Sequence, residues 1–178
     1  MKPIQEMSQG ELGAYVQSHL RAKGIHVILS GGASVAIYTN NLYVSRDLDF
    51  VNTHFTKRSV LQAAMQEIGF QENGRYFEHS ETSFLVEFPP GPLTVGEEPI
   101  RHINEIPFAT GMLQVISPTD CVKDRLSAFY HWGDRQCLAQ AILVANSQTT
   151  DIEDIRQWSL GEGKLEEFKE FFARLAHK

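Results

Sequence analysis

Residues 26–29 form a short, apolar, β-rich run that leads directly into Ser30-Gly31-Gly32. This composition is typical of a buried strand, and only a small backbone accepts the turn that follows it. Residues 33–38 are then compatible with a helix, and residues 47–51 form the next predicted strand. A chain that returns to strand after such a short helix is expected to build an α/β core.

The last third of the chain contains helical patterns only. Ser117-Pro118-Thr119-Asp120 marks a helix start, because it supplies a cap residue, a proline at the first helical position and an acid at the third. We therefore predict an α/β (α+β) fold with a small mixed β-sheet core flanked by helices over residues 1–116, and a C-terminal helical subdomain over residues 117–178 packed on that core. The other expected elements are helices at about 11–23 and 57–68, strands at 75–79, 83–88 and 111–116, a loop at 89–99, and helices from about 133, 152 and 163.

Composition narrows the classes of function. The formal net charge of -6 excludes a nucleic-acid binder of the generally basic kind. Two cysteines, without a segment resembling a signal peptide, predict reduced packing residues rather than a disulfide. No apolar run approaches the roughly 20 residues that a membrane helix needs. We therefore expect a cytoplasmic protein with no membrane partner.

Asp47 and Asp49 are the strongest candidates for chemistry. Side chains alternate along a strand, so these two carboxylates project from one face while Leu48 and Phe50 project from the other. Two like charges side by side repel, and a cation between them removes that cost. Ligands made only of oxygen suit Mg²⁺ or Mn²⁺. The alternative is that both aspartates line an exposed strand face or begin a turn.

Glu87 is a single carboxylate in the otherwise apolar run Phe84-Leu85-Val86-Glu87-Phe88. An unpaired buried carboxylate is costly, so this one is expected to be paired, protonated or bound to a metal. If its strand neighbours the strand of Asp47, it completes a site of three carboxylates. The alternative is that Glu87 ends the strand before Pro89 and points into solvent.

The glycine turn is a candidate anion site. A turn between a strand and a helix directs backbone N–H groups and the positive end of the helix toward an anion. Gly31 and Gly32, with Ser34 just inside the helix, are therefore expected to hold phosphate groups. An ordinary tight turn with no ligand is the alternative.

The order of these features resembles the polymerase-beta-like nucleotidyltransferase superfamily, and especially its small bacterial branch of abortive-infection and toxin–antitoxin transferases. That family has a hydrophobic strand, a Gly-Gly or Gly-Ser turn, an Asp-hydrophobic-Asp strand and a third acid on another strand. The resemblance covers residues 11–88 well and residues 117–155 more loosely, where Lys123 and the pair Asp134-Arg135 match a helical lysine and a following helix start. The chain departs from the family in having glutamate as the third acid and in being short.

The resemblance implies transfer of a nucleoside monophosphate from a nucleoside triphosphate to an acceptor, which is an RNA, a protein or a small molecule, with release of pyrophosphate. It implies that Asp47, Asp49 and Glu87 are catalytic and bind Mg²⁺ or Mn²⁺, and that Gly31, Gly32, Ser34 and Lys123 bind the nucleotide. A cognate antitoxin or toxin is a further implied partner.

Three alternatives stay open at this stage. The same fold can serve as a non-catalytic nucleotide-binding or toxin–antitoxin interaction module, and the same carboxylates can support phosphate-ester hydrolysis. Lys123 lies beside the apolar stripe of its helix, so a surface lysine that packs only its stem is the alternative to a phosphate ligand.

Overall fold

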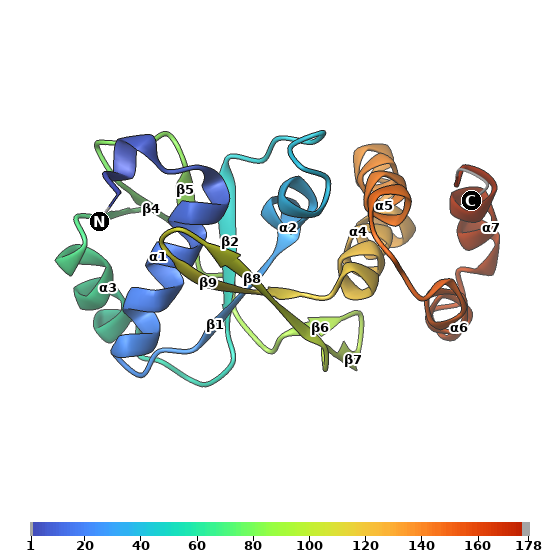
Figure 1. The fold of residues 1–178 in the computed structure, drawn as a ribbon. Helices are drawn as coiled ribbons and strands as arrows, with labels where there is room; N and C mark the ends of the chain where they lie inside the picture. Colours follow the sequence, from blue (N-terminus) through green and yellow to red (C-terminus); the bar gives the residue numbers. More distant parts are fainter. Residues whose placement is uncertain (1, 176–178) are drawn as a thin grey trace.

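The computed structural model describes residues 2–175, so residue 1 and residues 176–178, at the ends of the two expected segments, lie outside it. Its centre is a mixed seven-stranded sheet in the order β3-β4-β5-β2-β1-β9-β8 (Figure 1). This confirms the expected α/β class with a small mixed sheet. The strands of this sheet are β1 (Val27–Ser30), β2 (Asp47–Asn52), β3 (Gln71–Asn73), β4 (Tyr76–Glu78), β5 (Leu85–Glu87), β8 (Ile103–Phe108) and β9 (Gly111–Ile116).

Helices cover both faces of this sheet. Helices α1 (Gln9–Ala22) and α3 (Arg58–Glu67) lie on one side, and α2 (Gly31–Tyr38) lies on the other (Figure 1). The start of α1 follows from its sequence: Ser8 accepts the backbone N–H of Glu11, while the Glu11 side chain accepts the backbone N–H of Ser8. Leu12, Val16 and Leu20 recur along one face and are completely buried.

The transition from β1 to α2 is more abrupt than the sequence suggested. Helix α2 begins at Gly31 itself, so the two glycines form its first turn rather than a separate loop. The helix ends at Tyr38, before Asn40 and Asn41, which both have positive φ. Asparagine tolerates this left-handed conformation better than most residues, so the helix ends at residue 38, as the sequence indicated.

Strand directions bring distant segments of the chain together. Strand β1 pairs antiparallel with β2 and parallel with β9, and β2 pairs parallel with β5. The carboxyl end of β1 therefore lies beside the first half of β2, and there β2 pairs with the last residue of β5. The sequence-distant residues Ser30, Asp49 and Glu87 become neighbours across three strands.

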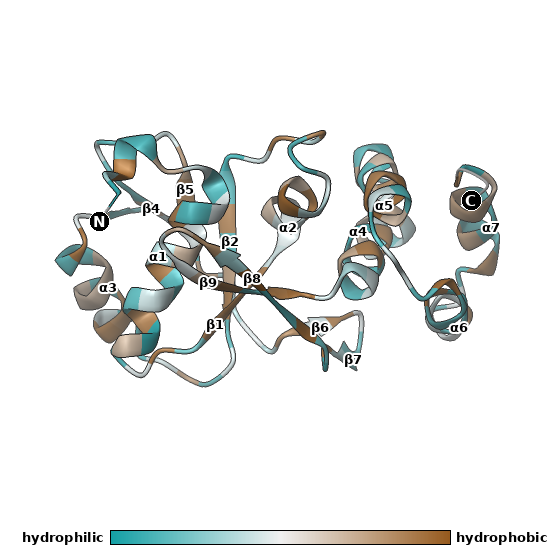
Figure 2. Ribbon diagram, viewed as in Figure 1, coloured by the Kyte–Doolittle hydropathy of each residue, from teal (hydrophilic) through white to brown (hydrophobic). Residues whose placement is uncertain are grey.

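Of the four helices after residue 116, the first two pack beside α2 rather than on the sheet, and the last two pack on those (Figure 1). Leu29 of the sheet belongs to the same buried hydrophobic cluster as Leu126 and Leu138, so apolar packing is continuous from the sheet into these helices. Figure 2 shows hydrophobic residues concentrated in β1 and β9, with hydrophilic residues on the outer turns of the helices. These C-terminal helices are α4 (Pro118–Trp132), α5 (Arg135–Ser147), α6 (Ile152–Gly161) and α7 (Leu165–Ala173). Between residues 2 and 175, no helix has the length and apolarity required to traverse a bilayer.

Three details differ from the expected elements. Strand β3 precedes the two strands expected around Glu87, and β8 precedes the last one. The segment expected to be only a loop contains a two-stranded hairpin of β6 (Thr94–Val95) and β7 (Glu98–Pro99). This hairpin lies between the sheet and α4 and forms part of two pockets.

Candidate active site

Asp47 and Asp49 lie on β2, and Glu87 lies on the adjacent strand β5. In the parallel register between these strands, Asp49 is opposite Glu87 and Asp47 is opposite Leu85. Residues opposite each other, and residues two apart on one strand, project from the same face. The structure therefore brings the three predicted acids to one face of the sheet.

Gly31 lies directly against Asp49. Its φ is +66°, and a Cβ at this position would lie 2.1 Å from Asp49 Oδ2. Side chains disfavour this φ, and the carboxylate leaves no room for a methyl group. Gly31 is thus required by its own backbone conformation and by the position of Asp49.

The other residues of the turn have different surroundings. The Ser30 hydroxyl donates a hydrogen bond to the Asp49 carbonyl oxygen at 3.3 Å, so Ser30 lies beside the acids. Ser34 is completely buried, and its hydroxyl donates to the Gly31 carbonyl at 2.6 Å and lies 3.1 Å from Cys121 Sγ. The Ser34 hydroxyl is directed into the protein, where it holds α2 against α4. Gly32 packs near Ser45, where an added Cβ would lie 3.1 Å from its Oγ.

The acids repel one another. Burial raises the pKa of Asp49 to about 6, and the neighbouring Glu87 and Asp47 carboxylates contribute to the rise. The closest cation to Glu87 is Arg75, whose Nε lies 3.7 Å from Glu87 Oε1. This ion pair is at the protein surface, since the Arg75 side chain is largely exposed, so its attraction is weak. Within residues 2–175, Asp47 and Asp49 form no ion pair and that of Glu87 is weak, so the negative charge on this face is poorly compensated.

The donor set fits Mg²⁺ or Mn²⁺ in type and in placement on one face, because such ions take carboxylate oxygens and neutralise like charges. Within residues 2–175, however, no three His, Cys, Asp or Glu side chains are gathered closely enough to form a ready-made metal site. Glu87 lies near Arg75 instead. Binding of all three acids to one ion consequently requires rotation of side chains.

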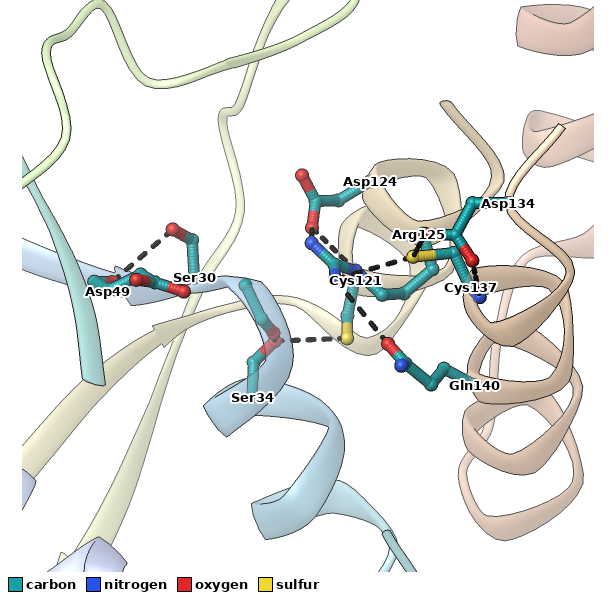
Figure 3. A network of polar contacts seen from close by, with 10 residues as sticks. Ser30, Ser34, Asp49, Cys121, Asp124, Arg125, Asp134, Cys137 and Gln140 are labelled. Carbon is teal, nitrogen blue, oxygen red and sulfur yellow. Dashed lines mark hydrogen bonds and ion pairs between the residues drawn. The ribbon is translucent and has the colours of Figure 1, made fainter. Parts of the chain in front are cut away.

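A pocket of about 430 Å³ opens over Asp49 and Glu87, whereas Asp47 is not among the residues that line it. Its floor includes Ser30, Gly31, Asp49 and Glu87, and its opposite wall is formed by Asp124 and Arg125 of α4 (Figure 3). The Pro-rich segment after β5 and the β6–β7 hairpin form its remaining sides through Pro89, Pro90, Pro92, Leu93, Thr94 and Ile100. The pocket is large enough for part of a nucleotide.

Lys123 is not in this pocket. It is buried and lines a separate pocket of about 590 Å³, where its Nζ lies 2.8 Å from Asp154 Oδ2 and 3.4 Å from Glu98 Oε2. Asp134 is also occupied elsewhere, because it caps α5 by accepting the backbone N–H groups of Gln136 and Cys137. The residues that sequence reasoning missed are therefore Asp124 and Arg125.

The spacing of residues along α4 explains why Arg125 lines this pocket and Lys123 does not. Successive residues in a helix are about 100° apart, so Lys123 and Arg125 project in roughly opposite directions. Arg125 lies one turn after Cys121, and Cys121 contacts Ser34 in α2. The face of α4 that packs on α2 thus carries Arg125 toward Gly31.

Comparison with known proteins supports the fold. No protein-family model and no curated protein matches this sequence. The structure is similar to an antigenic nucleotidyltransferase-like protein from Paracoccidioides brasiliensis, with a TM-score of 0.62, 12% identity, and coverage of 96% of this chain and 95% of that one. It is also similar to the antibiotic-resistance factor ANT(2'')-Ia, with a TM-score of 0.53, 15% identity, and coverage of 89% and 88%. Over nearly its whole length, the chain has the fold of nucleotidyltransferase-like proteins.

Proposed function

We propose that this protein is a metal-dependent nucleotidyltransferase, which moves a nucleoside monophosphate from a nucleoside triphosphate to an acceptor and releases pyrophosphate. The observation that carries the proposal is the placement of Asp49 between Gly31 and Glu87, with Asp47 on the same face. This arrangement puts carboxylates next to a helix start that can receive phosphate. The resemblance in sequence pattern and the similarity in fold point to the same chemistry.

The reaction forms a bond between an acceptor oxygen or nitrogen and the α-phosphorus, and it breaks the bond from that phosphorus to the pyrophosphate oxygen. Mg²⁺ or Mn²⁺, held by Asp47, Asp49 and Glu87, would supply positive charge to the attacking and leaving oxygens. The proton of the acceptor would leave to water or to a carboxylate oxygen of the site that the metal does not occupy. The backbone at Gly31 and the Ser30 hydroxyl would position the phosphates.

The direct test is transfer of label from each of the four nucleoside triphosphates, with Mg²⁺ or Mn²⁺, to RNA, protein or small-molecule acceptors. We expect one combination to be labelled, and we expect Asp47→Ala and Asp49→Ala to lower the rate by at least about a thousandfold. Asp154→Ala is the matched control, since it removes a half-exposed aspartate from the other pocket. Its rate should stay within about threefold of wild type.

Two other outcomes have defined meanings. Nucleotide binding without transfer would favour the non-catalytic binding or interaction module. Absence of both binding and transfer for all four nucleotides would refute the proposal. The acceptor panel includes antibiotics, because one protein of similar fold is an antibiotic-resistance factor.

We further propose that the chain belongs to the small bacterial abortive-infection and toxin-like branch, and that residues 117–178 act as a helical subdomain completing the pocket through α4. In that branch the partner is a cognate antitoxin or toxin. Co-expression with the neighbouring gene product tests this, because a cognate pair should co-purify and suppress the labelling activity. A freely monomeric, unaffected enzyme would contradict it.

A further inference from the structure

Arg125 is the one basic residue that lines the pocket over Asp49, among the residues the structure describes. The same pocket is lined by three carboxylates, those of Asp49, Glu87 and Asp124. A polyphosphate entering it meets a negative field, so its binding depends on metal cations and on this guanidinium. The position of Arg125 opposite the acids therefore determines where the phosphates of a nucleotide bind.

Hydrogen bonds to residues of α4 and α5 hold the Arg125 guanidinium in place. Asp124 Oδ2 accepts hydrogen bonds from Nε at 3.0 Å and from Nη2 at 2.5 Å, and Nη1 donates to Gln140 Oε1 at 3.4 Å and to Cys137 Sγ at 3.8 Å (Figure 3). A guanidinium has two N–H groups on Nη2. Within residues 2–175, the one hydrogen bond from Nη2 to Asp124 leaves the second of these groups without a protein acceptor.

Burial adds to this fixation. The Arg125 side chain is 18% exposed, so it is held at the pocket wall rather than moving freely in solvent. A preorganised guanidinium loses little entropy when it binds a phosphate, and its planar fork matches phosphate oxygens. Lys123 cannot make this contact, because its ammonium lies in the other pocket and is paired there with Asp154 and Glu98.

We propose that Arg125 binds the triphosphate of the nucleotide across the pocket from Asp49, and that Asp124 and Gln140 are positioning residues that hold its guanidinium. The proposal rests on the proposed function for the identity of the substrate. What it adds is a polyphosphate contact made by Arg125, in the role that the family resemblance implied for Lys123.

The test measures binding of inorganic tripolyphosphate by calorimetry, which requires neither the correct nucleoside nor turnover. It is carried out with Mg²⁺ on wild type, and in chelator on an Asp47→Asn/Asp49→Asn protein, where the repulsion is reduced. Arg125→Gln should weaken binding by at least about tenfold in both settings, because a charge-assisted contact is lost. Arg125→Lys should fall between Arg125→Gln and wild type, since it keeps the charge and loses the fork.

Three controls separate this role from a structural one. Lys123→Met and Arg101→Ala remove cations from the other pocket, so both should change tripolyphosphate affinity by less than about twofold. Asp124→Asn leaves the guanidinium in the pocket and should keep affinity within about threefold while lowering the rate of transfer. Thermal unfolding without ligand checks that each variant is folded.

The proposal is overturned if Arg125→Gln binds tripolyphosphate like its parent protein, or if Lys123→Met is the variant that loses binding. It is also overturned if neither folded wild type with Mg²⁺ nor the folded Asp47→Asn/Asp49→Asn protein in chelator binds any. A loss of affinity in Asp124→Asn that exceeds the loss in Arg125→Gln also overturns it, since Asp124 acts in the proposal only through Arg125. Binding that depends on Arg125 without any nucleotide transfer would leave this contact in place and refute the proposed function instead. Nucleotide transfer by Arg125→Gln with an unchanged KM for the nucleotide would refute the Arg125 contact and leave the proposed function in place.

Discussion

Helix α4 contributes to two pockets lined by charged residues, and the buried charged group of each pocket has different surroundings. Around Asp49, three acids and one arginine line the pocket, and burial together with like charges raises the pKa of Asp49. Around Lys123, the buried ammonium is satisfied by Asp154 at 2.8 Å and Glu98 at 3.4 Å. Both pockets are lined by more acids than cations, because the second also contains Asp120 and Asp151. They differ at the buried group, since Asp49 forms no ion pair within residues 2–175 whereas the buried Lys123 is paired. This difference, rather than the presence of charged residues, distinguishes the candidate active site.

The largest effect that sharpens this comparison is expected at Gly31. Gly31→Ala places a methyl group 2.1 Å from Asp49 Oδ2 in a backbone conformation with φ of +66°. We expect a loss of about 3 kcal/mol or more in unfolding free energy, because strain and overpacking add. Nucleotide transfer should fall to background. Urea unfolding and the labelling assay measure the two effects.

Gly24→Ala is the matched control for Gly31→Ala. Its φ of +75° is similarly unfavourable for alanine, but a Cβ there meets no atom within 4 Å. We expect a loss of only about 1 kcal/mol and unchanged activity, since the backbone term alone remains. Equal losses in the two variants would show that the approach of Gly31 to Asp49 is unimportant.

The next effect concerns the charge of Asp49. Its pKa is raised from 3.8 to about 6, so the folded protein holds this proton more tightly than the unfolded chain does. The resulting stabilisation is complete below about pH 4 and is lost as the pH rises through about 6. Above that pH, the folded state bears the cost of the ionised group.

Asp49→Asn removes this cost. We expect its unfolding free energy to exceed that of wild type by about 1–3 kcal/mol at pH 7.5 and to match it near pH 4. Mg²⁺ should stabilise wild type at pH 7.5 and not this variant. Asp154→Asn is the control with the opposite sign, because it removes an ion pair with Lys123 rather than a repulsion. Thermal unfolding at the two pH values, with and without Mg²⁺, measures these differences in stability. If Asp49→Asn were less stable than wild type at pH 7.5, the repulsion between the acids would be contradicted.

Local sequence patterns predicted most of the fold, and their failures have physical causes. Strand β8 was missed because it lies at the edge of the sheet, where Pro107 and the exposed Glu105 are tolerated and no alternating apolar pattern is required. The pairing of β2 with β5, which places Glu87 opposite Asp49, depends on tertiary contacts. Local patterns carry no information on such contacts, so the sequence supports this pairing only as a hypothesis.

The sequence predicted those parts of the site whose geometry is set within a single strand or turn. The Asp47 and Asp49 pair shares a face through the two-residue period of a strand, and the chain order predicted a helix directly after the glycines, although that helix begins at Gly31 rather than at residue 33. Ser34 was assigned to phosphate from its proximity in sequence, whereas its hydroxyl contacts Gly31 and Cys121 inside the protein. The choice between Lys123 and Arg125 depended on which face of α4 meets α2, which is a matter of packing.

The smallest expected effect concerns Lys123→Met, which removes the cation of the second pocket and keeps most of its buried stem. Removing one partner of a fully buried ion pair costs about 3–5 kcal/mol, since the other charge is left in the interior. Here the side chains of Asp154 and Glu98 are 50% and 60% exposed, so both carboxylates can return to water. We therefore expect a loss of only about 1 kcal/mol in urea unfolding, with nucleotide KM unchanged. A loss of several kcal/mol would mean that the second pocket shields its acids as strongly as the first, and a raised KM would place Lys123 in nucleotide binding after all.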